Sequence, residues 1–528
     1  MLGAMQDWTM RVTAVIDHAA REAGTREIVS RWADGTETRT NWRGIRTDAL
    51  KMAQALVALG VNKGDRVASL AMNHSRHLVS WYGVAGMGGV LHTINPRLFD
   101  DQLEYIANHA EDRVLLYDAA FQPIVDRMRD KWPTIEHYIC YDNGDFEQWI
   151  GAQDGAFEWV EGSERDPCML CYTSGTTGNP KGVLYEHRST VLHALAGLQP
   201  SAFNFSPSSV MLPVVPMFHA ASWGLPYAGA MAGIKFVFSA VNEPAVLCDL
   251  MEREGVTDSA GVPTVWLATF QYCDAAGKDL PKLRAATIGG SAAPKFMIER
   301  LMKNGTRVQH AWGMTETSPI GTVGSPTHDW DELSFDQKVA KTAMQGRPIF
   351  GVQLRTVDLD DMATELPRDG ETSGALQIRG PWVIKRYFKA NEDATNADGW
   401  FDTGDVGIIH PDGTLQLTDR TKDVIKSGGE WISSVELENA AVGHPLIAEA
   451  AAIGIPHPKW DERPVLFCVT KDGADLGSAE VIDYLKDKVA KWWLPDAVEF
   501  VDDIPHTATG KISKKDLRER FRDYTLEA

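Results

Sequence analysis

The chain has 528 residues, which suits two to four domains and exceeds what one ordinary hydrophobic core holds. Hydrophobic residues make up 44% and charged residues 23%, so wholly disordered, fibrous and collagen-like classes are excluded. The formal net charge is −20, which disfavours nucleic acid as a partner because the phosphate backbone would be repelled. Six cysteines in so long a chain fit a reducing compartment, and we expect a cytoplasmic protein.

The first 24 residues predict an amphipathic helix. Asp7 and Asp17 lie along it, whereas a signal peptide has a basic start and an unbroken apolar run. The most apolar window is Ser222–Val241, which holds one charge, Lys235, and is interrupted by Pro226 and several glycines. We expect a buried helix followed by a strand there, and no membrane span.

Helices and strands alternate through most of the chain. The apolar periodicity predicts helices at 47–60, 77–87, 118–130 and 245–254 and strands at 65–71, 114–117 and 137–141. This alternation predicts an α/β fold: a large N-terminal domain, residues 1–421, with helices layered on largely parallel sheets.

The pattern changes after Thr414, where a charge cluster at 419–423 separates two short apolar strands. The rest of the chain predicts helices at 434–442, 478–489 and 514–524 and strands at 450–455, 465–470 and 497–500. We expect residues 422–528 to form a small, mobile C-terminal α+β domain with a hinge near Lys422.

A loop rich in glycine and hydroxyl groups follows a strand-like run at 168–172 and spans residues 172–182. Its glycines let backbone N–H groups approach a ligand closely, its hydroxyls add donors, and its lysine adds a charge, which together suit a polyphosphate. The spacing is not that of a Walker A loop, and a plain surface linker would not need the Pro-Lys-Gly run that ends it. The expected phosphate contacts are Thr173, Ser174, Gly175, Thr176, Thr177, Gly178 and Lys181.

This loop resembles the phosphate loop of the adenylate-forming enzymes: acyl-CoA synthetases, luciferases and the adenylation domains of peptide synthetases. The resemblance continues in order along nearly the whole chain, through the segments 216–219, 289–292, 312–316, 399–405, 419–438 and 505–511. Residues 312–316 and 426–431 look most like the short- and medium-chain fatty acyl-CoA ligases, a branch that includes bacterial 3-methylmercaptopropionate-CoA ligases. The resemblance implies that an acid and ATP give acyl-AMP and pyrophosphate, and that CoA then gives acyl-CoA and AMP.

The resemblance also implies the nucleotide contacts. Glu316, with Thr173, is expected to bind Mg²⁺, since a hard carboxylate suits this ion beside phosphate oxygens. Asp405 is expected to accept hydrogen bonds from the ribose, and Trp312, where the family usually has tyrosine, to stack on adenine. An exposed glutamate, a turn-forming aspartate and a core tryptophan are the alternatives. Further contacts to ATP are expected from His219, Gly290, Ser291, Ala292, Ala311, Gly313, Met314, Thr315, Arg420 and Lys511.

The acyl group is expected to contact His219, Trp223, Gly290 and Gly313. Members that activate amino acids carry an aspartate where this chain has His219, so an amino acid is disfavoured as substrate. The indole of Trp223 would shorten the tunnel, which favours a short- or medium-chain acid or 3-methylmercaptopropionate. Core packing of these two side chains is the alternative.

Catalysis is expected to use two lysines of the small domain, together with Thr315. Lys511 would bridge the anionic carboxylate and the α-phosphate during adenylation. Lys426, beside two glycines, would serve the thioester step, and the small domain would rotate about Lys422 between the steps. A solvated basic helix after Lys511 and a surface ion pair of Arg420 with Asp419 or Asp423 are the alternatives.

Three questions remain open from the sequence. The acyl acceptor could be a separate carrier protein instead of CoA, and a nucleotide sensor without catalysis is a third class. The oligomeric state is undetermined, with a homodimer as one alternative. Cys168 and Cys171 have the spacing of a redox or zinc pair, but in a strand without a second pair we expect two buried thiols.

Overall fold

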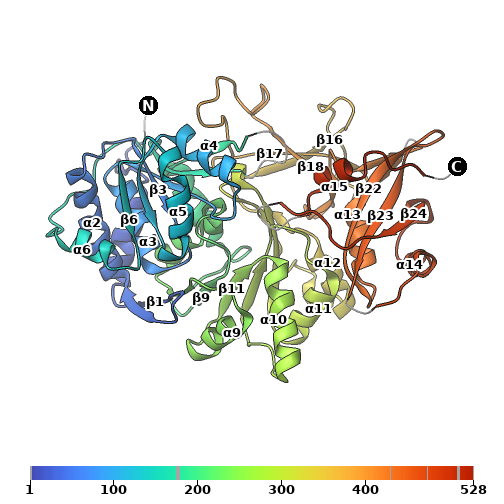
Figure 1. Cartoon of the computed structure of the whole chain (residues 1–528), viewed down its shortest axis with the longest axis horizontal. Helices are drawn as coiled ribbons and strands as arrows, with labels where there is room; N and C mark the ends of the chain where they lie inside the picture. Colours follow the sequence, from blue (N-terminus) through green and yellow to red (C-terminus); the bar gives the residue numbers. More distant parts are fainter. Residues whose placement is uncertain (1–2, 174–178, 429, 472–473, 508–511, 527–528) are drawn as a thin grey trace. The chain divides into compact units, whose positions relative to one another are not determined.

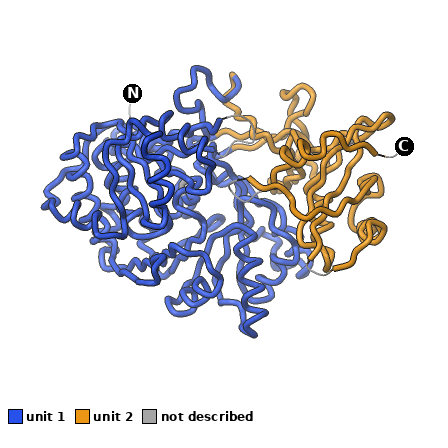
Figure 2. Tube along the Cα trace, in the orientation of Figure 1, with its two compact units in different colours: residues 1–175, 179–352, 380–396 blue, residues 176–178, 353–379, 397–528 orange. Residues whose placement is uncertain are grey.

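The computed structural model describes residues 3–173, 179–428, 430–471, 474–507 and 512–526. The chain divides into two compact units (Figure 2). The first consists of the described residues of 1–175, 179–352 and 380–396. The second consists of those of 353–379 and 397–528.

The first unit is built on two mainly parallel sheets (Figure 1). One has the strand order β6 (His137–Cys140), β5 (Asp112–Tyr117), β3 (Arg66–Leu70), β4 (Val90–Thr93), β7 (Pro167–Tyr172) and β8 (Gly182–Glu186), of which β8 is antiparallel. The other has the order β15 (Arg347–Pro348), β14 (Ile320–Val323), β13 (Arg307–Gly313), β12 (Ala285–Ile288), β11 (Asp258–Gly261), β9 (Val210–Pro213), β10 (Lys235–Ser239), β1 (Glu27–Arg31) and β2 (Glu37–Asn41). Its strands from β13 to β1 are parallel, and the antiparallel pairs lie at its ends.

Helices cover both sheets. The α-helices of this unit are α1 (Val12–Glu22), α2 (Trp42–Ala58), α3 (Ser75–Gly86), α4 (Asp100–Ala110), α5 (Gln122–Met128), α6 (Asp145–Gly151), α7 (His187–Gly197), α8 (Leu225–Ala232), α9 (Pro244–Arg253), α10 (Pro263–Ala276), α11 (Lys295–Lys303) and α12 (Phe335–Ala343). Short 3₁₀ helices are η1 (Ala119–Phe121), η2 (Arg129–Lys131), η3 (Ala220–Gly224), η4 (Thr315–Thr317) and η5 (Trp330–Glu332). Helices α9 to α12 share one apolar core with the second sheet, and α4 and α5 share another with the first.

Helix α3 lies between the two sheets. Every residue of it except Arg76 is buried, and it contacts β4 and β7 of the first sheet and β1 of the second. A helix that is buried on all sides belongs in such a position. The structure thereby confirms the expected layers of helices on parallel sheets.

The second unit has two smaller sheets. One has the order β16 (Gln353–Val357), β17 (Ser373–Arg379), β18 (Phe401–Ile409) and β19 (Leu415–Arg420), all antiparallel. The other has the order β21 (Glu430–Ile432), β20 (Ile425–Ser427), β23 (Asp461–Thr470) and β22 (Ile447–His457), with β24 (Ala497–Phe500) on β23. Helices α13 (Ser434–Val442), α14 (Ser478–Leu485) and α15 (Lys514–Arg520) and the 3₁₀ helix η6 (Lys491–Trp493) complete this α+β unit.

Most expected helices and strands are present, but some begin or end at other residues than expected. The first helix is α1, and residues 3–11 are not helical, because the apolar face that packs in the core begins at Val12. Helix α15 ends at Arg520, since Phe521 and Tyr524 turn back to pack on the ring of Phe467. The apolar window at 222–241 holds the expected buried helix, α8, and then strand β10.

The compact units describe how the chain packs, whereas the expected boundary at residue 422 describes where one part of the chain would move relative to the other. The strands β16 to β19 pair with one another and belong to the second unit, although they precede residue 422. A pivot at Lys422 therefore stays a prediction. Lys422 itself is exposed, and its carbonyl accepts a hydrogen bond from Arg518 of α15 at 3.0 Å.

Within the described residues, no helix has both the length and the hydropathy needed to cross a membrane. Cys168 and Cys171 are both buried on β7, as expected. Burial raises the pKa of the Cys168 thiol to about 12, so this thiol stays protonated.

A buried ion pair joins α15 to α13 in the second unit. Lys514 Nζ lies 2.8 Å from Glu438 Oε1 and 2.5 Å from Ser434 Oγ, whose hydroxyl donates to Asp419. Burial raises the pKa of Glu438 from 4.5 to about 7, although Lys514 acts against the shift. Removing the cation leaves two buried carboxylates without their positive partner.

We expect Lys514→Met to lower the free energy of unfolding by about 3–5 kcal/mol. Glu438 has a higher pKa in the folded state than in the unfolded state, so its contribution to stability falls as the pH rises from about 4.5 to about 7. Without Lys514 this pKa rises further, and the loss should be larger at pH 8 than at pH 6. Urea unfolding at pH 6 and at pH 8 measures this loss of stability. Lys515→Met, an exposed neighbour on the same helix, is the control and should change stability by under about 0.5 kcal/mol. Equal effects of the two substitutions would contradict the prediction.

Candidate functional site

The predicted motifs of the first unit follow the carboxyl ends of parallel strands. Thr173 follows β7, the 216–219 segment follows β9, and the 289–292 turn follows β12. Residues 311–316 end β13 and form η4. Because β9, β11, β12 and β13 are parallel neighbours, three of these motifs meet at one edge of the second sheet, where α/β proteins bind ligands.

Two hydrogen bonds between Thr173 and Lys181 hold the base of the phosphate loop. Thr173 N donates to Lys181 O at 2.9 Å, and Lys181 N donates to Thr173 Oγ1 at 3.3 Å. These bonds continue the pairing of β7 with β8 as far as Thr173 and Lys181. The other expected phosphate contacts, Ser174, Gly175, Thr176, Thr177 and Gly178, lie outside the described residues.

Glu316 is buried, and its carboxylate is part of a network. Tyr387 Oη donates to Glu316 Oε1 at 2.7 Å, and Tyr185 Oη donates to the carbonyl of Thr315 at 2.7 Å. The ammonium of Lys181 lies 4.9 Å from the centroid of the Tyr387 ring. Tyr387 therefore links the phosphate-loop lysine to the expected metal ligand, a role that the sequence did not reveal.

The donors present suit Mg²⁺ together with phosphate oxygens. The described residues contain no group of three or more His, Cys, Asp and Glu side chains placed to hold a metal ion. Mg²⁺ is commonly bound by one or two carboxylates plus substrate phosphates instead of an all-protein cage. Glu316 with the hydroxyl of Thr173 fits that kind of site.

Two glycines of the expected adenylate and acyl contacts are required by their surroundings. Gly290 has φ +84°, and a Cβ there would lie 3.1 Å from Val262 Cγ1. A Cβ on Gly313 would lie 1.8 Å from the carbonyl oxygen of Pro319. Side chains are thus excluded at both positions, which leaves the backbone accessible. Ala293 N donates to His310 Nε2 at 3.3 Å, and this hydrogen bond fixes the turn that contains Ser291 and Ala292.

Trp223 lies beside the same turn. A Cβ built on Gly289 would be 3.3 Å from Trp223 Cη2, and 9% of Trp223 is exposed. Ala220, Ser222 and Trp223 all have positive φ values, between 42° and 57°. Non-glycine residues rarely adopt this conformation, and where they do the surrounding structure holds them there, often at ligand sites. Trp312 is buried, whereas His219 is partly exposed.

Asn73 holds the 213–219 segment in place. Its side-chain amide donates to Pro213 O at 2.9 Å and to Val215 O at 3.0 Å, and its Oδ1 accepts from Met217 N at 2.7 Å. Asp118 fixes the neighbouring backbone by accepting from Met72 N at 2.7 Å. The sequence held no signal for Asn73, since it stands alone after β3 and its partners lie about 140 residues away.

The second unit holds the remaining candidates. Asp405 on β18 and Arg420 on β19 are register partners, with Asp405 Oδ1 at 3.4 Å from Arg420 Nε. Arg420 therefore faces the other predicted ribose ligand, and the alternative pairing of its guanidinium with Asp423 is wrong, because Asp423 pairs with Arg518. Lys426 is exposed, with its ammonium 5.2 Å from the Trp431 ring centroid. Lys511 lies outside the described residues.

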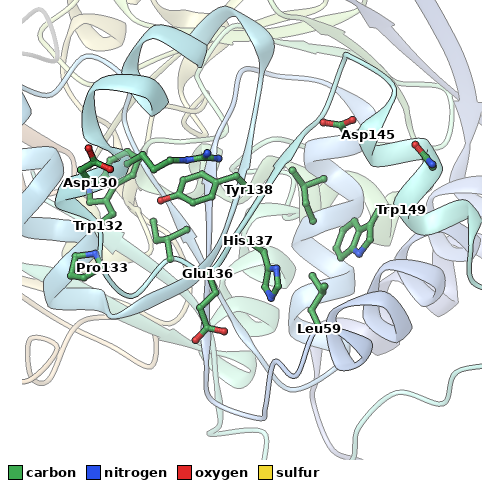
Figure 3. A pocket seen from close by; sticks show the side chains of 13 residues that line it. Leu59, Asp130, Trp132, Pro133, Glu136, His137, Tyr138, Asp145 and Trp149 are labelled. Carbon is green, nitrogen blue, oxygen red and sulfur yellow. The ribbon is translucent and has the colours of Figure 1, made fainter.

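A surface pocket of about 880 Å³ lies elsewhere (Figure 3). Trp132, Glu136, His137, Tyr138 and Trp149 are among the residues that line it. It lies at β6, at the opposite end of the first sheet from β7 and β8, which carry the phosphate loop. None of the predicted site residues lines it, so its size does not make it the candidate site.

Comparison with known proteins identifies the family. The model of the AMP-binding enzyme family matches residues 16–388, and that of the AMP-binding enzyme C-terminal domain matches residues 436–511. The chain therefore belongs to the AMP-binding enzyme family, as an AMP-forming acid–CoA ligase.

Particular relatives match over the whole length. The chain is 46% identical to 3-methylmercaptopropionyl-CoA ligase of Ruegeria lacuscaerulensis, over 99% of both chains. It is 44% identical to medium-chain-fatty-acid–CoA ligase of Ectopseudomonas oleovorans, over 100% of this chain and 99% of that protein. Among solved structures, an anthranilate CoA ligase in complex with anthranoyl-AMP has a TM-score of 0.86 and 25% identity over 98% of both chains. These relatives confirm the expected family and reaction class.

We expect Asp405→Ala to weaken ATP binding by about 1–3 kcal/mol, because it removes hydrogen bonds from the ribose to a charged group. Equilibrium titration with ATP measures the loss. Asp360→Ala, which removes an exposed carboxylate from another part of the second unit, is the control and should leave the ATP Kd within about twofold. An unchanged Kd for Asp405→Ala would contradict the ribose assignment.

Proposed function

We propose that this ligase activates a short- or medium-chain carboxylic acid or 3-methylmercaptopropionate in a cytoplasmic setting, with ATP, Mg²⁺ and CoA. The observation that carries the choice of acid is the indole of Trp223 beside Gly289, which bounds the space next to the expected acyl position. The names of the two relatives support the same range of acids. His219 supports it too, since an amino acid would need an anion there for its ammonium.

In the first step, the substrate carboxylate attacks the α-phosphorus of ATP and pyrophosphate leaves, which forms acyl-AMP. Asp405 and Arg420 hold the ribose and phosphate, Trp312 stacks on adenine, and Lys511 stabilises the charge between the two anions. Bound Mg²⁺ would neutralise phosphate charge, held by Glu316 and Thr173. Thr315, whose carbonyl is fixed by Tyr185, presents its neighbour Glu316 to the nucleotide.

In the second step, the thiolate of CoA attacks the acyl carbon and AMP leaves. A rotation about Lys422 replaces Lys511 with Lys426 at the reaction centre. Two different steps at one site need two sets of groups, and a small second unit that carries both lysines supports this assignment.

The test is CoA-dependent AMP release with propionate, butyrate, hexanoate, octanoate and 3-methylmercaptopropionate. We expect the highest kcat/KM for one of these acids, with low activity on palmitate and none on amino acids. Preference for palmitate or for an amino acid would contradict the proposed substrate. Equal pyrophosphate release with and without CoA, and no acyl-CoA, would favour a carrier protein as the acceptor.

A further inference from the structure

Tyr387 lies between two nucleotide-binding motifs that are far apart in the chain. It belongs to the 380–396 segment, which packs within the first unit although its flanking strands belong to the second. Its hydroxyl donates to Glu316 Oε1 at 2.7 Å, and its ring centroid lies 4.9 Å from Lys181 Nζ. One side chain thus contacts the expected metal ligand and the phosphate-loop lysine.

The backbone on both sides of Tyr387 is anchored to the same two motifs. Phe388 N donates to Gly182 O at 2.8 Å, directly after the phosphate-loop lysine. Ile384 N donates to the carbonyl of Glu316 at 2.7 Å. Because main-chain bonds fix the segment at both ends, the position of the ring relative to the two motifs is set by the fold.

The chemistry of each contact suits the group that it holds. A phenol hydroxyl donates one hydrogen bond to a carboxylate and so orients it, and an aromatic face attracts an ammonium. In this pair the hydroxyl is the donor, because an ionised carboxylate only accepts.

We propose that Tyr387 is a positioning residue of the nucleotide site, which orients the Glu316 carboxylate toward Mg²⁺ and holds the Lys181 ammonium at the base of the phosphate loop. This inference rests on the proposed ATP site and adds a residue that acts on it through two others. Tyr387 does not touch the reacting atoms. Its hydroxyl serves the metal and its ring serves the lysine, so two substitutions separate the two roles.

The test measures equilibrium binding of ATP by calorimetry, once with Mg²⁺ and once with EDTA, in the absence of acid. Tyr387→Phe keeps the ring and removes the hydroxyl. We expect its affinity for ATP with Mg²⁺ to fall about tenfold, the effect of one hydrogen bond to a charged group, while binding in EDTA is unchanged. Tyr387→Leu removes the ring as well, and its affinity should fall about threefold further in both conditions.

Controls separate positioning from general damage. Tyr117 lies on β5, and its hydroxyl donates to Gln122 Oε1 at 2.7 Å. Tyr117→Phe removes this hydroxyl and should change the affinity for ATP neither with Mg²⁺ nor with EDTA. In a Glu316→Gln background, Tyr387→Phe should cause no further loss of affinity with Mg²⁺, because the two residues act as one unit.

Three outcomes would overturn the inference: unchanged binding by Tyr387→Phe, equal losses with Mg²⁺ and with EDTA, or additive losses in the double variant. A wild-type chain that does not bind ATP would instead overturn the proposed function. A wild-type chain that binds ATP with Mg²⁺, together with an unaffected Tyr387→Phe variant, would overturn this inference alone.

Discussion

Replacing Lys511 with alanine should lower acyl-adenylate formation by about 100- to 1,000-fold, the usual effect of removing one group that stabilises transition-state charge. The substrate carboxylate and the α-phosphate are both anions, and the lysine would be the cation between them during attack. ATP binding should change little, because the other contacts to the nucleotide remain. The thioester step uses Lys426, so the variant should still convert pre-made acyl-adenylate and CoA to acyl-CoA.

Pyrophosphate release and acyl-CoA formation from pre-made acyl-adenylate measure the two steps separately. Lys515→Ala, an exposed lysine four positions further along, is the matched control and should keep both activities. If Lys511→Ala cannot convert pre-made acyl-adenylate to acyl-CoA, Lys511 is needed for the thioester step, which would contradict its assignment to adenylation.

Replacing Trp223 with alanine should shift the preference of the enzyme toward longer acids. The indole lies beside Gly289, so its removal opens apolar space next to the expected acyl position. Each further methylene buried there contributes about 0.8 kcal/mol, which is about fourfold in kcat/KM. Three further buried methylenes would raise the octanoate-to-propionate ratio about 60-fold, while ATP affinity stays the same.

A panel of acids measures this ratio in the wild type and the variant. Trp149→Ala removes a partly exposed indole from α6, far along the first sheet from the phosphate loop, and should leave the ratio unchanged. If Trp223→Ala loses activity equally on all acids and its Tm falls, Trp223 is a core residue and another group limits chain length.

The fold could be predicted where its signal is local. Apolar periodicity predicted α2, α3 and α9, and helix α13 over the residues observed. Helix ends were less accurate, because they depend on tertiary packing such as that of Phe521 on Phe467. The grouping of β16 to β19 with the second unit had no local signal, since it arises from pairing between strands.

The site shows the same division. The contacts expected of the phosphate loop and of the turn at 289–292 stay predictions. Their signal is local, because glycines and hydroxyls are the residue types needed for close backbone approach to a ligand. Residues with such a signal could be named from the sequence. Tyr387 and Asn73 could not, because each acts through hydrogen bonds to residues 71 and about 140 positions away. A single tyrosine or asparagine in an irregular segment has no pattern that reveals such a partner.

The central claim is that the acid is activated by attack of its own carboxylate on the α-phosphorus of ATP. A substrate acid with ¹⁸O in both carboxylate oxygens, incubated with ATP, Mg²⁺ and CoA, tests it most directly. We predict that mass spectrometry finds one ¹⁸O atom in AMP and none in pyrophosphate, because the bridging oxygen of acyl-AMP stays with AMP when the thiolate displaces it. Unlabelled AMP, or label in pyrophosphate or phosphate, would contradict an acyl-adenylate intermediate.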